Sequence, residues 1–421
     1  MTRKIAFTDK NGEIVLEIPL KLKKRVHRKQ FFDVAYIDDF RKIMNTPYFQ
    51  KSKAYSLKFN LCCAVADRLN TCVAYLNKRL KHPKTEEDFL SFLMFACMMR
   101  DAVETILEEF GVLPNCQGEE QFQFFKDVYV NSKVYNSEKD VPTDDDFFEY
   151  FRSLTFAHPV DTKRAKFLHK ELKEKHYCPF VLINRFWGDP ECVGARIYTN
   201  VSKDILDVYI PFERLKNYLK FKYEQLSLAT DYLKQKHLDL ESSWKEDKIN
   251  RNLPPLEILQ EIKEKLEQRC EETYNVSELI LFLKYKPSLK QNEKSTLEYQ
   301  RAIIDCLPSL CEAVEQLDYE KMHSVFETVL YVRPRSAERF NYQLGCIYAD
   351  LNSATDAARY SYTLGCVRWV VEAFAHEWVD INEDMPADEI RFLISAACYL
   401  EESACKMGQN AANYKDFMND A

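Results

Sequence analysis

One short segment, Arg152 to Pro159 (RSLTFAHP), places an arginine and a histidine six positions apart. Proline cannot continue a helix and disfavours helical geometry at the residue before it, so we expect His158 at a helix C-terminus. The negative end of a helix dipole favours an imidazolium ion, which suits a general acid that protonates a leaving oxygen. Arg152 stays charged and presents a planar fork of donors that could bind a phosphate group. These residue types indicate chemistry at a phosphodiester, with Ser153 as an orienting hydroxyl.

The same spacing resembles the R-x(4–6)-H motif of the HEPN superfamily, whose members are compact helical bundles and include metal-independent ribonucleases. A polar residue usually follows the arginine in that family, and Ser153 occupies this position here. The resemblance implies an endoribonuclease in which Arg152, Ser153 and His158 are catalytic, with no metal and no other cofactor. It also implies attack by a ribose 2′-hydroxyl to leave a 2′,3′-cyclic phosphate, and a homodimer that pairs two motifs across one cleft. We expect such an enzyme to serve as a toxin or phage-defence effector.

Two alternatives stay open from the residues alone. In the first, Arg152 pairs with a nearby acid such as Glu149 or Asp146, and the motif histidine caps the helix end. The chain would then be a non-catalytic helical interaction or scaffold protein. In the second, the relevant match is Arg164 to His169 (RAKFLH), where an alanine follows the arginine and the segment is typical of an ordinary charged helix.

Basic side chains follow the motif closely and could track the backbone of an RNA strand. Glu171 and Glu174 interrupt this basic run, so a solvated helix face stays open as the alternative. The residues that we assign to RNA binding are Lys163, Arg164, Lys166 and Lys170.

Cysteine usage indicates a reducing compartment rather than a metal or disulfide framework. The chain has 14 cysteines scattered through hydrophobic stretches, and no C-x-x-C pair occurs. Such thiols pack as small hydrophobic side chains. His176, Cys178 and Cys192 offer three zinc ligands, but no fourth stands at a usual spacing, so we predict no metal site.

The elements that must position the motif are mostly helices. Only 8 glycines occur in 421 residues, which disfavours all-β and dinucleotide-binding folds. Apolar spacing and turn signals predict a mainly α fold. We expect a small N-terminal β-hairpin and basic linker over 1–30, a HEPN-like helical bundle over 31–240 with an inserted β-hairpin near 193–210, and a C-terminal all-helical domain over 255–421. Within the bundle, predicted helices cover 53–80, 85–111, 119–130, a segment that starts at 143, and 212–240.

Charge and hydropathy limit the partners. The net charge of −7 disfavours a protein that coats nucleic acid through a global basic field, although a nuclease needs only a local basic cleft. The chain starts without the apolar run of a signal peptide, and no stretch approaches about eighteen uninterrupted apolar residues. We therefore expect a cytoplasmic protein with no membrane partner. The expected partners are RNA, a second copy of the chain, and a protein inhibitor or sensor partner bound through the C-terminal domain.

Overall fold

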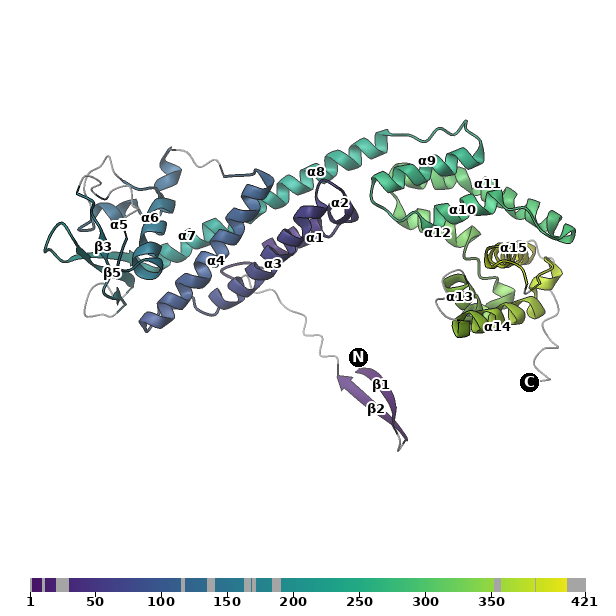
Figure 1. Ribbon diagram of the computed structural model, residues 1–421, viewed down its shortest axis with the longest axis horizontal. Helices are drawn as coiled ribbons and strands as arrows, with labels where there is room; N and C mark the ends of the chain where they lie inside the picture. Colours follow the sequence, from purple (N-terminus) through teal and green to yellow (C-terminus); the bar gives the residue numbers. More distant parts are fainter. Residues whose placement is uncertain are drawn as a thin grey trace. The chain divides into compact units, whose positions relative to one another are not determined.

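The computed structural model describes residues 2–9, 12–19, 30–114, 118–134, 141–162, 168, 172–183, 191–351, 357–382 and 384–406. The chain forms two compact units, shown with their helices in Figure 1. The first comprises Met1–Met44 and Lys58–Tyr232, and the second comprises Asn45–Leu57 and Leu233–Ala421. Helices dominate both units, which confirms the predicted mainly α fold. The boundary lies inside helix α8 (Leu226–Glu246), ahead of the polar stretch 241–255 that we expected to separate the domains.

The longest helix of the first unit begins and ends where its sequence predicts. The hydroxyl of Thr85 accepts a hydrogen bond from the backbone N–H of Asp88, and Gly111 ends the helix with a left-handed φ of 65°. This helix, α4 (Glu86–Phe110), packs on α7 (Phe212–Glu224) through its apolar face. The other helices of the unit are shorter or less buried. They are α1 (Ala35–Met44), α3 (Ser56–Leu76), α5 (Lys126–Val130), α6 (Asp144–Arg152) and α7 (Phe212–Glu224).

The predicted helix over 119–130 was wrong as a continuous element. The structure has a short 3₁₀ turn, Gly118–Phe122, followed by α5. Between them the carboxylate of Asp144 accepts hydrogen bonds from three successive backbone N–H groups, those of residues 123 to 125, at 2.7 to 3.1 Å. These N–H groups are bound to a side chain instead of to helical carbonyls, so the helix is interrupted.

Two antiparallel sheets accompany the helices. The N-terminal hairpin pairs β1 (Thr2–Asp9) with β2 (Gly12–Pro19), as predicted. The inserted hairpin is also confirmed, with β5 (Cys192–Thr199) antiparallel to β6 (Leu206–Pro211). Two further strands that the sequence did not predict, β3 (His176–Tyr177) and β4 (Val181–Leu182), pair with β5 as well. β5 and β6 approach so closely that a Cβ on Gly194 would lie 2.4 Å from the carbonyl oxygen of Val208.

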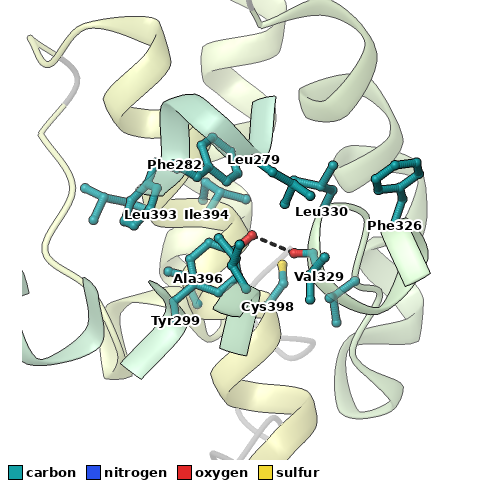
Figure 2. Close-up of a cluster of buried hydrophobic side chains, with 14 of the residues drawn as sticks. Leu279, Phe282, Tyr299, Phe326, Val329, Leu330, Leu393, Ile394, Ala396 and Cys398 are labelled. Carbon is teal, nitrogen blue, oxygen red and sulfur yellow. Dashed lines mark hydrogen bonds between the residues drawn. The ribbon is translucent and has the colours of Figure 1, made fainter. Parts of the chain in front are cut away.

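The second unit is helical throughout its described part, and the helices between Pro255 and Lys406 contribute side chains to its core. Figure 2 shows this core, where the hydroxyl of Tyr299 donates a hydrogen bond of 2.6 Å to the carbonyl of Val329. No described helix of the chain is long and apolar enough to cross a membrane. The helices of the unit are α2 (Pro47–Lys51), α9 (Pro255–Gln268), α10 (Tyr274–Lys284), α11 (Glu293–Gln316), α12 (Tyr319–Val329), α13 (Asn341–Asp350), α14 (Ala357–Ala373) and α15 (Ala387–Lys406).

Candidate active site

Helix α6 carries the arginine of the motif at its last position. The helix starts at Asp144 because the hydroxyl of Thr143 accepts a hydrogen bond of 3.1 Å from the N–H of Asp146. Its apolar side is buried, and Phe147 and Phe151 have no exposed surface. Arg152 follows directly and retains an exposed side-chain fraction of 30%. The buried aromatic side therefore anchors the helix and leaves the guanidinium at the surface.

A π-helical turn, Ser153–Ala157, separates the arginine from the histidine. The N–H of His158 donates to the carbonyl of Ser153 at 2.7 Å, five residues earlier in the chain. We expected the end of an ordinary helix here, so this wide turn is a correction. Leu154 and Thr155 of this turn are buried, and Pro159, which has no N–H, prevents the helix from continuing past it. Single π turns inside helices occur often at functional sites.

His158 leaves the helical conformation, with φ −142° and ψ 56°. Its imidazole is exposed, and no described residue forms a hydrogen bond with the ring. Its backbone is held instead, because its carbonyl accepts hydrogen bonds from the N–H of Asp161 at 3.1 Å and the hydroxyl of Thr162 at 2.9 Å. The ring can therefore reach a ligand from a fixed backbone.

Arg152 is paired with Glu149, as the first alternative from the sequence anticipated. Its Nε and Nη2 atoms donate to Oε2 of Glu149 at 3.1 and 2.7 Å. A guanidinium has five N–H donors, so this contact leaves three of them, including both on Nη1, without an acceptor among the described residues. The carboxylate thus holds one edge of the guanidinium and leaves the other edge available to an anion.

The same carboxylate has a second cationic partner, Arg100 from α4. Nη2 of Arg100 donates to Oε1 of Glu149, and the Arg100 side chain is only 7% exposed. Arg100 also lies 3.0 Å from Asp101 and stacks over the ring of Phe148 at 4.9 Å. Burial would raise the pKa of the Glu149 carboxyl, but the two guanidinium groups outweigh burial and lower that pKa. Arg100 is therefore the buried partner of Glu149, and Arg152 is its outer partner.

Ser153 takes part through its backbone. It is half-buried, and its carbonyl accepts the hydrogen bond from His158 that closes the π turn. The orienting role that we expected for its hydroxyl stays a prediction.

The segment after the motif is tied to strand β3. The N–H of Cys178 donates to the carbonyl of Pro159 at 2.6 Å. Thr162 and His176 exchange two backbone hydrogen bonds, of 2.9 and 3.2 Å. Because β3 pairs in turn with β5, the sheet supports the backbone on the C-terminal side of the motif.

Strand β3 also reaches the N-terminal side of the motif. The hydroxyl of Tyr150 lies 2.8 Å from Nδ1 of His176, and Nε2 of the same ring lies 3.1 Å from Oε1 of Glu174. Burial lowers the pKa of the His176 imidazole, against the opposite effect of the Glu174 carboxylate. Both ring nitrogens are thus occupied, and the thiol of Cys178 donates to the carbonyl of Phe180 at 3.4 Å. Within the described ranges no group of three His, Cys, Asp or Glu side chains is arranged to hold a metal ion.

The predicted RNA-binding residues are not placed by the structure. All of them lie outside the described residues, as does the second motif match, Arg164 to His169, apart from Leu168. The residues concerned are Lys163, Arg164, Lys166 and Lys170. Of the basic side chains that follow, Lys175 forms an ion pair of 2.9 Å with Asp161.

Comparisons with known proteins add no relative. No protein-family model, curated protein or solved structure matches this chain. The site therefore has to be interpreted from its own geometry.

Sequence reasoning missed three residues that support the motif: Arg100, Tyr150 and His176. Each lies in an unremarkable local context, and only the tertiary fold brings it to the motif. The nearest signal in the sequence is the set of three possible zinc ligands, His176, Cys178 and Cys192.

Proposed function

We propose that this protein is a metal-independent endoribonuclease of the HEPN type. One observation carries the proposal: Arg152 and His158 border a single π turn, the first with an edge of free donors and the second with an exposed imidazole. When a neighbouring hydroxyl attacks a phosphodiester, a guanidinium edge can stabilise the charge on the phosphate and an imidazole can protonate the leaving oxygen.

The proposed reaction uses these groups in separate roles. The Nη1 edge of Arg152 binds the scissile phosphate and stabilises the charge that develops on it. The ribose 2′-oxygen attacks phosphorus and loses its proton to water, and the bond from phosphorus to the 5′-oxygen breaks. His158 donates a proton to that leaving oxygen. The products are a 2′,3′-cyclic phosphate and a free 5′-hydroxyl. DNA is not a substrate, because it has no 2′-hydroxyl.

The proposal includes a homodimer that pairs two motifs and a role as a toxin or defence effector in the cytoplasm. The cysteines that the structure describes are free thiols, which suits a reducing compartment. The second unit would bind a protein inhibitor or sensor partner.

Cleavage of a labelled RNA by the purified full chain in the presence of EDTA tests the proposal. We expect wild-type protein to cut, and His158→Ala to lower the rate by about 10²- to 10⁴-fold. His323→Ala is the matched control, because His323 is also an exposed histidine but belongs to α12 of the second unit. Equal cleavage by wild type and His158→Ala would remove the proposal, as would a product without a cyclic phosphate.

A second candidate function is favoured by the pairing of Arg152 with Glu149. If the only role of Arg152 is to form this ion pair, the chain is a helical interaction or scaffold protein that does not cut RNA. Such a protein would lose stability on Arg152→Ala and would show no RNA cleavage in any form. The cost of that substitution in free energy of unfolding separates the two candidates.

A further inference from the structure

A single buried residue, His176, contacts the chain on both sides of the Arg152–His158 segment. Its ring meets the hydroxyl of Tyr150, two residues before the arginine, at 2.8 Å. Its backbone N–H and carbonyl both bond to Thr162, four residues after the histidine, at 2.9 and 3.2 Å. The proposed catalytic function uses none of these contacts directly.

The direction of the side-chain hydrogen bonds follows from their chemistry. An ionised carboxylate can only accept, so Nε2 of His176 carries the hydrogen that is donated to Glu174. In the neutral ring Nδ1 then has a lone pair, which accepts from the hydroxyl of Tyr150. The Tyr150–His176–Glu174 relay therefore has one arrangement while the ring is neutral.

Burial makes this relay specific. Tyr150 is 3% exposed and His176 is 2% exposed. Water cannot readily replace a hydrogen-bond acceptor at a buried hydroxyl, so breaking the bond from Tyr150 to His176 costs free energy. This hydrogen bond adds a directional constraint on the rotation of α6, which the buried aromatic side of the helix also anchors.

We propose that His176 is a positioning residue that holds Arg152 and His158 in register, through Tyr150 on one side and Thr162 on the other. This inference rests on the proposed ribonuclease function for its effect on rate, but the positioning itself is independent of it. The π turn lies between these two anchoring contacts, and its hydrogen bonds close a wider ring than those of an α-helix. We therefore expect a change at either contact to alter the π turn first.

Tyr150→Phe tests the proposal, because it removes one hydroxyl and leaves the aromatic packing. We expect kcat for RNA cleavage to fall by about tenfold to a hundredfold, because Arg152 at the end of α6 is then misplaced relative to the charge that develops in the transition state, with a smaller effect on KM. We also expect amide hydrogen exchange at His158 to become faster, on the order of fivefold or more.

Two further variants separate positioning from a general loss of stability. In His176→Asn the amide oxygen takes the place of Nδ1 and can accept from Tyr150, so kcat and exchange should stay within about threefold of wild type. Tyr223→Phe is the control, because it removes an equally buried hydroxyl, bonded at 2.6 Å to the carbonyl of Asp33, away from the motif. It should leave kcat and exchange at His158 unchanged.

Measuring both kcat and amide exchange at His158 distinguishes failure of the positioning role from failure of the ribonuclease proposal. Unchanged exchange at His158 in Tyr150→Phe overturns the positioning role, whatever the activity. Faster exchange in a protein that cuts no RNA supports the positioning role and removes the ribonuclease proposal. If Tyr150→Phe does not fold, His176→Leu can be compared with His176→Asn, because leucine cannot accept the hydrogen bond from Tyr150 and asparagine can. Equal amide exchange at His158 in these two variants also overturns the inference.

Discussion

Arg100 and Arg152 share the carboxylate of Glu149, but the Arg100 side chain is much more deeply buried. Their contributions to the free energy of unfolding should therefore differ. The side chain of Arg100 is 7% exposed and has three acidic neighbours, whereas that of Arg152 is 30% exposed and has one. Removing a buried partner leaves an uncompensated charge, while removing an outer partner leaves water to take its place. Arg100 is therefore enough to keep Glu149 ionised in the folded protein.

This difference predicts unequal costs for the two arginines. We expect Arg152→Ala to lower the free energy of unfolding by about 1 kcal/mol or less, because the pair is partly exposed and screened by water. We expect Arg100→Ala to cost more, on the order of 2–3 kcal/mol, because it removes a buried side chain packed on Phe148 and leaves its acidic neighbours with one cation fewer. Urea unfolding at neutral pH measures both. If Arg152→Ala and Arg100→Ala lowered the free energy of unfolding equally, Arg152 would have a structural role, which favours the scaffold alternative.

The motif itself was predictable from sequence, but its supporting residues were not. The run from Arg152 to Pro159 is local, so residue types and the proline determine much of it. Arg100 lies 49 residues from Glu149, and Tyr150 lies 26 residues from His176. No periodicity in one segment reveals a partner at that separation, which only the tertiary fold supplies.

At the scale of elements, α6, the π turn and strand β3 form one structural module around the motif. The start of α6 was predicted, because Thr143 and the acidic first turn are local signals. The π turn was not, because an α-helical turn and a π turn differ only in which carbonyl accepts the N–H of His158, and no local residue type decides between the two. Strands β3 and β4 have two residues each, which is too short for any alternation of apolar and polar side chains.

The relay between α6 and β3 predicts a dependence of stability on pH. The pKa of His176 is lowered in the folded protein, whereas an unfolded imidazole has its usual value near 6.5. The unfolded chain therefore binds more protons below about pH 6.5, and stability is full above that pH and decreases as the pH falls towards the folded pKa. The ionisable groups nearest the ring are Tyr150 on α6 and Glu174 on its own segment.

Urea unfolding at several pH values between about 7.5 and 5 measures this effect. Wild-type protein should lose stability over this range, and His176→Asn should lose less, because asparagine does not titrate. The other seven histidines are common to both proteins, so their contributions cancel in the difference. Parallel curves for the two proteins would contradict the assignment of a neutral, buried His176.

At the scale of the whole molecule, the sequence predicted two main helical parts, and the structure has two compact units. The assignment of residues 45–57 to the second unit could not be predicted. It depends on contacts such as Tyr48 with Trp244, at 5.6 Å between ring centroids, and Lys51 with Glu272, at 2.6 Å. These partners lie about two hundred residues away in sequence, where local patterns carry no information.

The second unit contains a buried ion pair that predicts how its stability responds to substitution. Nε of Arg391 lies 2.9 Å from Glu278, both side chains are at most 6% exposed, and the guanidinium stacks on Tyr348 at 4.3 Å. Arg391→Met alone should destabilise this unit by about 3–5 kcal/mol, because it leaves a buried carboxylate without a cation. Thermal unfolding of the full chain measures the loss.

The double variant Arg391→Met with Glu278→Leu provides the control for that prediction. Since it removes both charges and keeps apolar volume, it should recover most of the lost stability. A double variant as unstable as Arg391→Met would mean that packing of the guanidinium on its aromatic neighbours, rather than the ion pair, stabilises this unit.

The placement of residues 45–57 in the second unit has a consequence for biosynthesis. The aromatic side chain of Phe49 packs near His237, at 6.1 Å between ring centroids, and is fully buried in the finished protein. A ribosome adds about 5–20 residues per second, so this side chain emerges roughly 10 to 40 s before its partner exists. Until then residues 45–57 must stay solvated or be shielded by a chaperone. The first unit, which ends at Tyr232, has been synthesised completely before His237 is added, so it can fold while residues 45–57 still lack their partners in the second unit.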